Sequence, residues 1–188
     1  GAKSNSKMVL LMTTHREPLK THCDNIFNEI CKKLKFDDNI EIHVKPHPVE
    51  SRTNTIIKFG KGIKIHEQDV DLHALIGASD IIISPATSVI VPALAMNIPF
   101  VNLLDPNSGI EDSHLYLPLI ELLGETIGDV SEIDEWIKTP PKFDAERIVE
   151  IFKKVGYKSD GKNGKRIFDL CKWASLGKPI EQWKDRIE

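Results

Sequence analysis

The chain has 188 residues, 40% of them hydrophobic, and a formal net charge of −3 at pH 7. This composition fits one domain with a proper core, and it contains no long block of basic residues that would suit a nucleic-acid backbone. We therefore expect no nucleic-acid partner, although one phosphorylated small molecule remains compatible with this charge. The three cysteines lack CxxC spacing, which favours reduced thiols and a cytoplasmic protein. No apolar stretch reaches the roughly 18 residues that a membrane span needs.

The first seven residues, GAKSNSK, are polar and lack an initiator Met. We expect residues 1–7 to be a cloning scar or a linker. Residues 8–188 are then expected to form a single domain.

Apolar runs and hydrophobic spacing predict strands that alternate with helices through the first hundred residues. In chain order we expect a strand over 8–14, a helix over about 20–35, a strand over 40–48, a weaker strand over 62–67, a short helix over 71–79, a strand over 80–84, a helix over 87–97 and a strand over 98–104. This alternation predicts an α/β fold, namely a Rossmann-like doubly wound sheet with mostly parallel strands.

The rest of the chain is predicted to hold a long loop followed by helices. The loop covers 105–124, and helical patterns follow at about 131–137, 144–154 and 163–175. A helical C-terminal segment is therefore expected over about 131–188.

Polar residues gather at the C-terminal ends of three predicted strands. These clusters are Thr13-Thr14-His15-Arg16, Lys45-Pro46-His47-Pro48 and Ser84-Pro85-Ala86-Thr87-Ser88. Ligands of such sheets bind in the crevice outside the carboxyl ends of the strands. Topology alone therefore predicts that the three clusters converge.

Thr87 and Ser88 stand where the helix over 87–97 is expected to begin. A hydroxyl can cap that helix, and the free backbone N–H groups, at the positive end of the helix dipole, can receive a phosphate or diphosphate. A hydroxyl that only caps the helix explains the same pattern. The residues alone do not decide between these two roles.

The histidines of the other two clusters have basic neighbours. His47 lies in a loop stiffened by prolines, beside Lys45. Its imidazole can donate a hydrogen bond to a phosphate oxygen or act as a general acid or base, or the segment is simply a rigid surface loop. Arg16, which follows His15, can pair with a phosphate or carboxylate, or form a surface salt bridge with an acid such as Glu17.

Motifs of several other protein classes are absent from the sequence. The chain has seven histidines but no HExxH and no Cys/His cluster, so we expect no metal. It also lacks GxGxxG, a P-loop and GxSxG, which argues against NAD binding, ATP hydrolysis and serine-hydrolase chemistry. We expect no cofactor.

The three clusters, in this order, resemble a known family. "VKPHP" followed by "SDIIISPATSVIVPALAMNIPFVNL" resembles the C-terminal half of capsule-polysaccharide and teichoic-acid glycosyltransferases of the GT-B fold, where a "K-x-HP" loop precedes a "D-SS-x-x-x-D-A-L-x-x-N-x-P" segment. "TTHREPLKTHCDNIFNEI" is similar to the "THR-x-EN" stretch of the related UDP-N-acetylglucosamine 2-epimerases, and "DGKNGKRI" to "DGKAxxRI" near the end of such transferases. The likeness covers about residues 8–103.

The resemblance implies one GT-B-type half, the donor-binding domain of a glycosyltransferase for surface polysaccharide. Its ligand would be a nucleotide-activated sugar or polyol. The catalytic residues implied are His47, facing the donor phosphate or leaving group, and His15, at the border of the cleft between the two domains. The residues implied to bind the donor phosphate are Lys45, Arg16, Ser84, Thr87 and Ser88.

One position departs from the family pattern. The acidic residue of the family's helix, which can contact ribose, falls at Pro92, so the nucleotide preference is not predicted. The epimerase alternative would need the carboxylates of a "GG-x-x-EE" segment, and residues 87–92 contain none. A third alternative is a non-catalytic α/β module that binds a protein partner.

Size supports the resemblance to one half of an enzyme. A GT-B enzyme needs two Rossmann-like domains, roughly 300 residues or more, and only one fits here. We therefore expect a fragment or a stand-alone half with little or no turnover by itself. Its partner would be the missing N-terminal acceptor-binding domain, and the full-length enzyme is expected to be able to associate peripherally with a membrane.

Overall fold

The structure is a computed structural model of the chain. It describes residues 6–15, 17, 19–52, 63–85, 88–103, 130–140, 142, 144, 146, 148–150 and 161–177, with the backbone alone at 51, 52 and 163. The chain divides into two compact units, Gly1–Phe143 and Asp144–Glu188. This boundary lies inside the helical segment predicted over 131–188.

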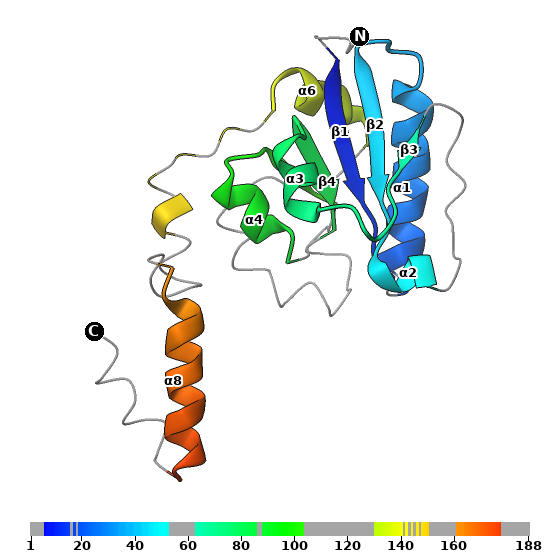
Figure 1. The fold of residues 1–188 in the computed structure, drawn as a ribbon. Helices are drawn as coiled ribbons and strands as arrows, with labels where there is room; N and C mark the ends of the chain where they lie inside the picture. The colour runs from blue at the N-terminus through cyan, green and yellow to red at the C-terminus, as the bar shows by residue number, and fades with distance from the viewer. Residues whose placement is uncertain are drawn as a thin grey trace. The chain divides into compact units, whose positions relative to one another are not determined.

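Five parallel strands form the sheet of the first unit (Figure 1). They are β1 (Lys7–Met12), β2 (Ile40–Lys45), β3 (Lys64–Ile65), β4 (Ile81–Ser84) and β5 (Phe100–Asn102). Their order is β3-β2-β1-β4-β5, and every neighbouring pair is parallel. The predicted Rossmann-like α/β fold is confirmed.

The register of the sheet brings the ends of three strands level. Met12 of β1 pairs with Lys45 of β2, and Leu11 pairs with Ile83 of β4. The polar residues that follow β1, β2 and β4 therefore lie along the same edge of the sheet.

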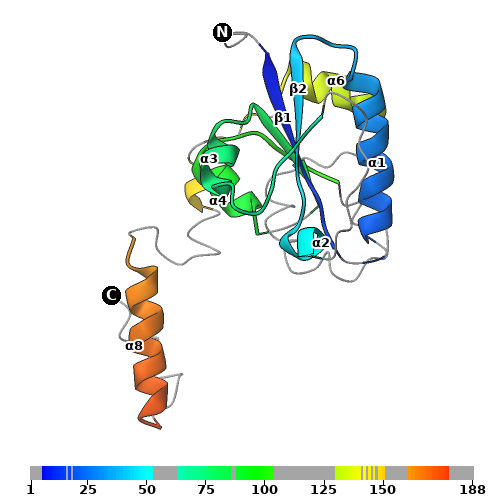
Figure 2. The same cartoon turned by 45° about the vertical axis from the view of Figure 1, so that its right-hand side comes forward.

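Helices cover both faces of this sheet (Figures 1 and 2). One face carries α1 (Leu19–Leu34) and α6 (Ile133–Lys138), which follows the short 3-10 helix η2 (Val130–Glu132). The other face carries α3 (Leu72–Gly77) and α4 (Ile90–Ala95), while α2 (Pro48–Arg52) follows β2 at the carboxyl edge. In the second unit, α8 runs over Asn163–Ser175.

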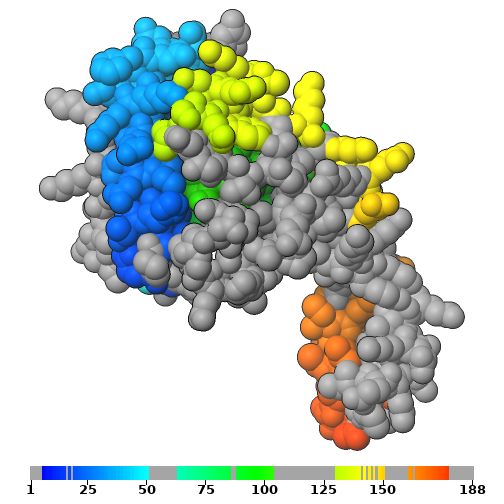
Figure 3. Space-filling model, turned by 180° about the vertical axis from the view of Figure 1, so that it is seen from behind, coloured from blue at the N-terminus to red at the C-terminus, as the bar shows by residue number. Residues whose placement is uncertain are grey.

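The core under α1 follows from its hydrophobic spacing. Phe27 and Ile30 of α1 are fully buried and belong to one cluster with Val9 and Leu11 of β1 and with Ile133 of α6. Alternate residues of a strand point to opposite faces of the sheet. The remaining apolar residues of β1 therefore point toward the face that carries α3 and α4. Figure 3 shows α6 and η2 beside one end of α1, where Lys33 forms an ion pair of 2.9 Å with Asp134.

The predicted elements within the described residues occur in the predicted order, with three differences. β3 has only two residues, and α4 begins at Ile90, three residues later than expected. The sequence pattern does not predict α2 at all. The predicted loop over 105–124 lies outside the described residues, as does part of the helix predicted over 144–154. No helix in the described part of the chain is both long and apolar enough to cross a membrane.

Candidate functional site

The polar clusters lie beside the point where the strand order of the sheet reverses. The chain proceeds from β1 outward to β3 on one side and then returns to β4 on the other side of β1. Ligands of open α/β sheets bind outside the carboxyl ends of the strands at this switch point. Of the predicted site residues, Arg16 and Thr87 lie outside the described residues.

His15 and His47 meet at this edge. Their ring centroids are 4.1 Å apart, and the ring planes are inclined by 32°. Both side chains are half-buried, and Nδ1 of His15 is buried without a hydrogen-bond partner among the described residues. The two histidines proposed from sequence as catalytic residues are therefore neighbours.

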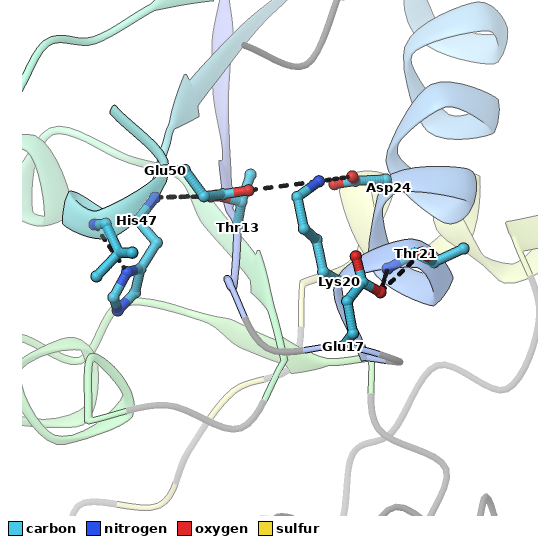
Figure 4. Close-up of polar contacts among 8 residues, drawn as sticks. Thr13, Glu17, Lys20, Thr21, Asp24, His47 and Glu50 are labelled. Carbon is cyan, nitrogen blue, oxygen red and sulfur yellow. Dashed lines mark hydrogen bonds and ion pairs between the residues drawn. The ribbon is translucent and has the colours of Figure 1, made fainter. Parts of the chain in front are cut away.

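The main chain of His47 is tied to the end of β1 and to α2 (Figure 4). Its N–H is shared between Oγ1 of Thr13, at 2.9 Å, and Oε2 of Glu50, at 3.0 Å. Its carbonyl accepts the N–H of Glu50 at 2.9 Å. The ring also takes part, because the N–H of Val49 donates to Nδ1 at 3.2 Å.

These bonds form the N-terminal cap of α2. His47 directly precedes the helix, and Glu50 is its third residue. In a capping box, the residue before the helix accepts an N–H of the first turn, and an acid three residues later binds back to that residue's own N–H. His47 and Glu50 follow this pattern, with an imidazole in place of the usual hydroxyl.

Glu50 belongs to a partly buried cluster of charged side chains. Glu50 is only 2% exposed, and its carboxylate accepts the hydroxyl of Thr13. Nζ of Lys20 lies 3.6 Å from Oε1 of Glu50 and also forms an ion pair with Asp24. Figure 4 shows Lys20 reaching between the two carboxylates.

The pKa values of this cluster respond to burial and to charge. Burial by itself lowers the pKa of Lys20. The hydrogen bonds and charges of Asp24 and Glu50 outweigh this effect, so the Lys20 pKa is raised. Burial raises the pKa of Asp24, with Glu50 adding to the effect and Lys20 opposing it. Lys20 is therefore held as a cation between two acids.

Sequence reasoning missed this cluster. Glu50 and Lys20 lie outside the three polar clusters of the sequence. Thr13 belongs to the first of them, but no role was assigned to it. The available signal was the spacing of Glu50 three residues after His47, which is the spacing of a capping box.

Lys45 makes a different contact from the one expected. Its side chain is buried, and Nζ donates to the carbonyl of Glu67, in the connection between β3 and α3. Burial lowers the pKa of Lys45, opposed by the charges of Asp69 and Glu67. Its proposed contact with phosphate stays a prediction.

A second histidine pair lies along β2. Nε2 of His66 and Nδ1 of His43 are 2.9 Å apart, and Nε2 of His43 lies 3.5 Å from the Glu41 carboxylate. His43 and His47, four apart in sequence, thus belong to separate pairs. Within the described ranges, no group of three or more histidine, cysteine or acidic side chains could hold a metal ion.

The third cluster is described only in part. Ser84 is fully buried and donates to the carbonyl of Pro85 at 2.9 Å, whereas Ser88 is exposed. Val89 occupies the cap position of α4 and makes no side-chain cap bond, while the carbonyl of Ser88 accepts the N–H of Val91 at 3.3 Å. Among the described residues, the Ser88 hydroxyl does not cap α4, because the helix begins two residues beyond it. The alternative of a cap by Thr87 lies outside the described residues.

Pro92 lies in the first turn of α4 and is half-buried. A proline is tolerated there because the N–H that it lacks would have no partner within the helix. The position expected from the family to carry an acid is therefore filled by a residue that suits the local helix.

The fold of this chain is similar to the folds of several solved structures. No protein-family model matches the chain, and no curated protein matches it. The chain is similar to the S. aureus MnaA structure with UDP, with a TM-score of 0.58 and 17% identity over 93% of this chain and 48% of that one. The predicted family resemblance is confirmed at the level of the fold.

Two further structures show the same GT-B-type half. A structure of the wall teichoic acid polymerase TagF soaked with CDPG matches with a TM-score of 0.53 and 19% identity, over 98% of this chain and 44% of that one. UDP-GlcNAc 2-epimerase of Methanocaldococcus jannaschii, in complex with UDP-GlcNAc and UDP, matches with a TM-score of 0.50 and 18% identity, over 82% and 47%. The chain spans less than half the length of each of these three structures.

Proposed function

We propose that the chain is the nucleotide-sugar or nucleotide-polyol donor-binding domain of a glycosyltransferase that assembles a surface polysaccharide. The observation that carries this proposal is the contact between His15 and His47, with ring centroids 4.1 Å apart, beside the switch point of the sheet. The three similar structures described above contain UDP, CDPG, or UDP-GlcNAc with UDP, which supports a nucleotide ligand.

In this proposal the two histidines and Arg16 face the donor phosphates. Imidazole and guanidinium groups donate hydrogen bonds to phosphate oxygens, and Arg16 does so as a permanent cation. Ser88, with Thr87 and the buried Ser84, belongs to the same donor-phosphate site. Lys45 contributes its positive charge at longer range, because its Nζ is engaged by the Glu67 carbonyl. The chemistry is stabilisation of a departing phosphate by these groups.

The proposal extends to the whole enzyme. A donor-binding half acts on an acceptor held by a second domain, so we propose an N-terminal acceptor-binding domain as the partner. We further propose that the complete enzyme works in the cytoplasm and associates peripherally with the membrane, and that this half alone has little or no turnover.

A second candidate is a domain similar to UDP-N-acetylglucosamine 2-epimerases. The likeness to the M. jannaschii epimerase favours it. Epimerisation requires groups that remove and return a proton at carbon, and the carboxylates of Glu50 and Asp24 are already bound to Lys20. A transferase domain, which needs donors toward phosphate rather than free carboxylates, agrees better with these contacts.

Isothermal titration calorimetry of the chain with UDP-, CDP- and CMP-linked donors tests the proposal. We expect binding of at least one donor, and binding weakened at least about tenfold by His47→Ala, because one hydrogen bond to a charged group is lost. Glu29→Gln is the control, since Glu29 is exposed on α1. Absence of binding for every donor, in a sample shown to be folded by circular dichroism, would contradict the proposal.

A further inference from the structure

The ring of His47 makes a hydrogen bond within the protein that defines its protonation. The N–H of Val49 points at Nδ1 at 3.2 Å. A backbone N–H can only donate, so Nδ1 must act as the acceptor and carry no proton. A neutral imidazole has one proton, which in this ring must then be on Nε2.

We infer that His47 is held as the Nε2–H tautomer by its role as the cap of α2, and that Glu50 is the residue that positions it. The two nitrogens thereby have separate tasks. Nδ1 stabilises the first turn of the helix by accepting the Val49 N–H, and Nε2 acts as a hydrogen-bond donor toward an acceptor outside this turn. From the sequence alone, the imidazole of His47 could be a hydrogen-bond donor, a general acid or a general base.

The positioning role of Glu50 follows from its contacts. Its Oε2 lies 3.0 Å from the N–H of His47, so the carboxylate holds the main chain from which the ring projects. The same carboxylate accepts the hydroxyl of Thr13, at the end of the neighbouring strand. With Lys20 3.6 Å from Oε1, this buried acid has support from β1, α1 and α2 together.

The chemical consequence rests on the proposed function. A neutral ring with its proton on Nε2 has no lone pair there with which to take a proton, so His47 does not act as a general base through this atom. It donates a hydrogen bond to an acceptor such as an oxygen of the donor phosphate. No proton has to be transferred for this contact to stabilise negative charge.

The tautomer can be measured without any nucleotide. Long-range ¹H–¹⁵N correlation spectra of the ¹⁵N-labelled chain, near neutral pH, distinguish a protonated from an unprotonated ring nitrogen. We expect Nδ1 of His47 to have the shift of an unprotonated nitrogen and Nε2 that of a protonated one. The opposite assignment would overturn the inference, even if a nucleotide binds. The expected assignment together with no nucleotide binding would instead overturn only the proposed function.

Variants of Glu50 test the positioning role by the same signature. In Glu50→Ala we expect the His47 nitrogen shifts to move toward those of a mixture of tautomers, and in Glu50→Gln to return part of the way, because an amide oxygen can still accept the His47 N–H. Glu29→Ala, on the exposed side of α1, should leave them unchanged. Wild-type shifts in both folded Glu50 variants would show that Glu50 does not position the ring. If Glu50→Ala does not fold, Glu50→Gln and the wild-type spectrum still decide the inference.

Discussion

The imidazole rings of His15 and His47 lie 4.1 Å apart between centroids although a helix and a strand separate them in the chain. The parallel pairing of Met12 with Lys45 explains this meeting, because each histidine follows one of these residues by two or three positions. The ends of β1 and β2 therefore present the two rings together at the carboxyl edge of the sheet.

A pair of substitutions separates the structural and the chemical task of His47. His47→Asn keeps an acceptor near the position of Nδ1, and asparagine is a preferred cap residue, so we expect the free energy of unfolding to change by less than about 0.5 kcal/mol. His47→Gln places its amide farther out and should lose about 1 kcal/mol. Urea denaturation of both variants measures the difference. Equal loss in the two would show that the ring does not cap α2.

Stability should depend on Lys20 more than on an exposed lysine of the same helix. Lys20→Met leaves Glu50, which is 2% exposed, without its nearby cation, and we expect a loss of about 2 kcal/mol in the free energy of unfolding. Lys33→Met removes a partly exposed pair with Asp134, and should cost at most about 1 kcal/mol. Chemical denaturation compares the two. A smaller loss for Lys20→Met than for Lys33→Met would contradict the structural role of the partly buried cluster.

The pair of His43 and His66 predicts a loss of stability at acidic pH. Burial lowers the pKa of His43, with Lys64 adding to the effect and Glu41 opposing it. Burial, followed by the charges of His43, Lys64 and Lys45, lowers the pKa of His66. The unfolded chain therefore binds protons at a higher pH than the folded chain, and stability falls as the pH drops below the usual histidine pKa of about 6.5.

A matched pair of variants isolates this contribution. His66→Gln should lose less stability than the wild type between about pH 7.5 and about pH 5.5, because one of the two coupled imidazoles is gone. His73→Gln, at an exposed position of α3, should behave as the wild type does. Urea denaturation at both pH values provides the comparison, and an unchanged pH dependence in His66→Gln would refute the assignment.

Pro92 offers a test of the family likeness. The likeness expects an acid that can contact ribose at this position, and an acid in the first turn of a helix is favourable. We expect Pro92→Glu to fold and to bind a nucleotide donor up to about tenfold more tightly, as one added hydrogen bond allows. Pro92→Ala, which removes the ring without adding a carboxylate, is the control in calorimetry. Equal affinity in the two variants would mean that this position does not face the nucleotide.

Strongly apolar segments made most of the fold predictable. The runs that became β1 and β4, and the spacing of Ile26, Ile30 and Leu34 in α1, identify buried elements by hydrophobicity alone. Once strands and helices alternate, the parallel arrangement follows. Parallel strands have their carboxyl ends at one edge of the sheet, so the convergence of His15 and His47 at that edge was also predictable.

Features that depend on particular side-chain contacts left a weak signal in the sequence, as the spacing of His47 and Glu50 did, or none. The segment of α2, PVESR, has no apolar periodicity, and its helix is closed by bonds from His47 and Glu50. The pairing of His43 with His66 depends on how the chain leaves β3, and the contact of Lys45 with Glu67 depends on the same connection. These two contacts join residues of different elements, so no pattern within a single strand or helix indicates them.

The most direct test of a donor site at the carboxyl edge is a ¹H–¹⁵N NMR titration of the chain with UDP and with a CDP-linked donor. We expect the largest backbone amide shifts at His15, at His47 with its neighbours in α2, and at Ser88. Large shifts confined to other parts of the chain, or no shifts at saturating nucleotide in the folded chain, would contradict it.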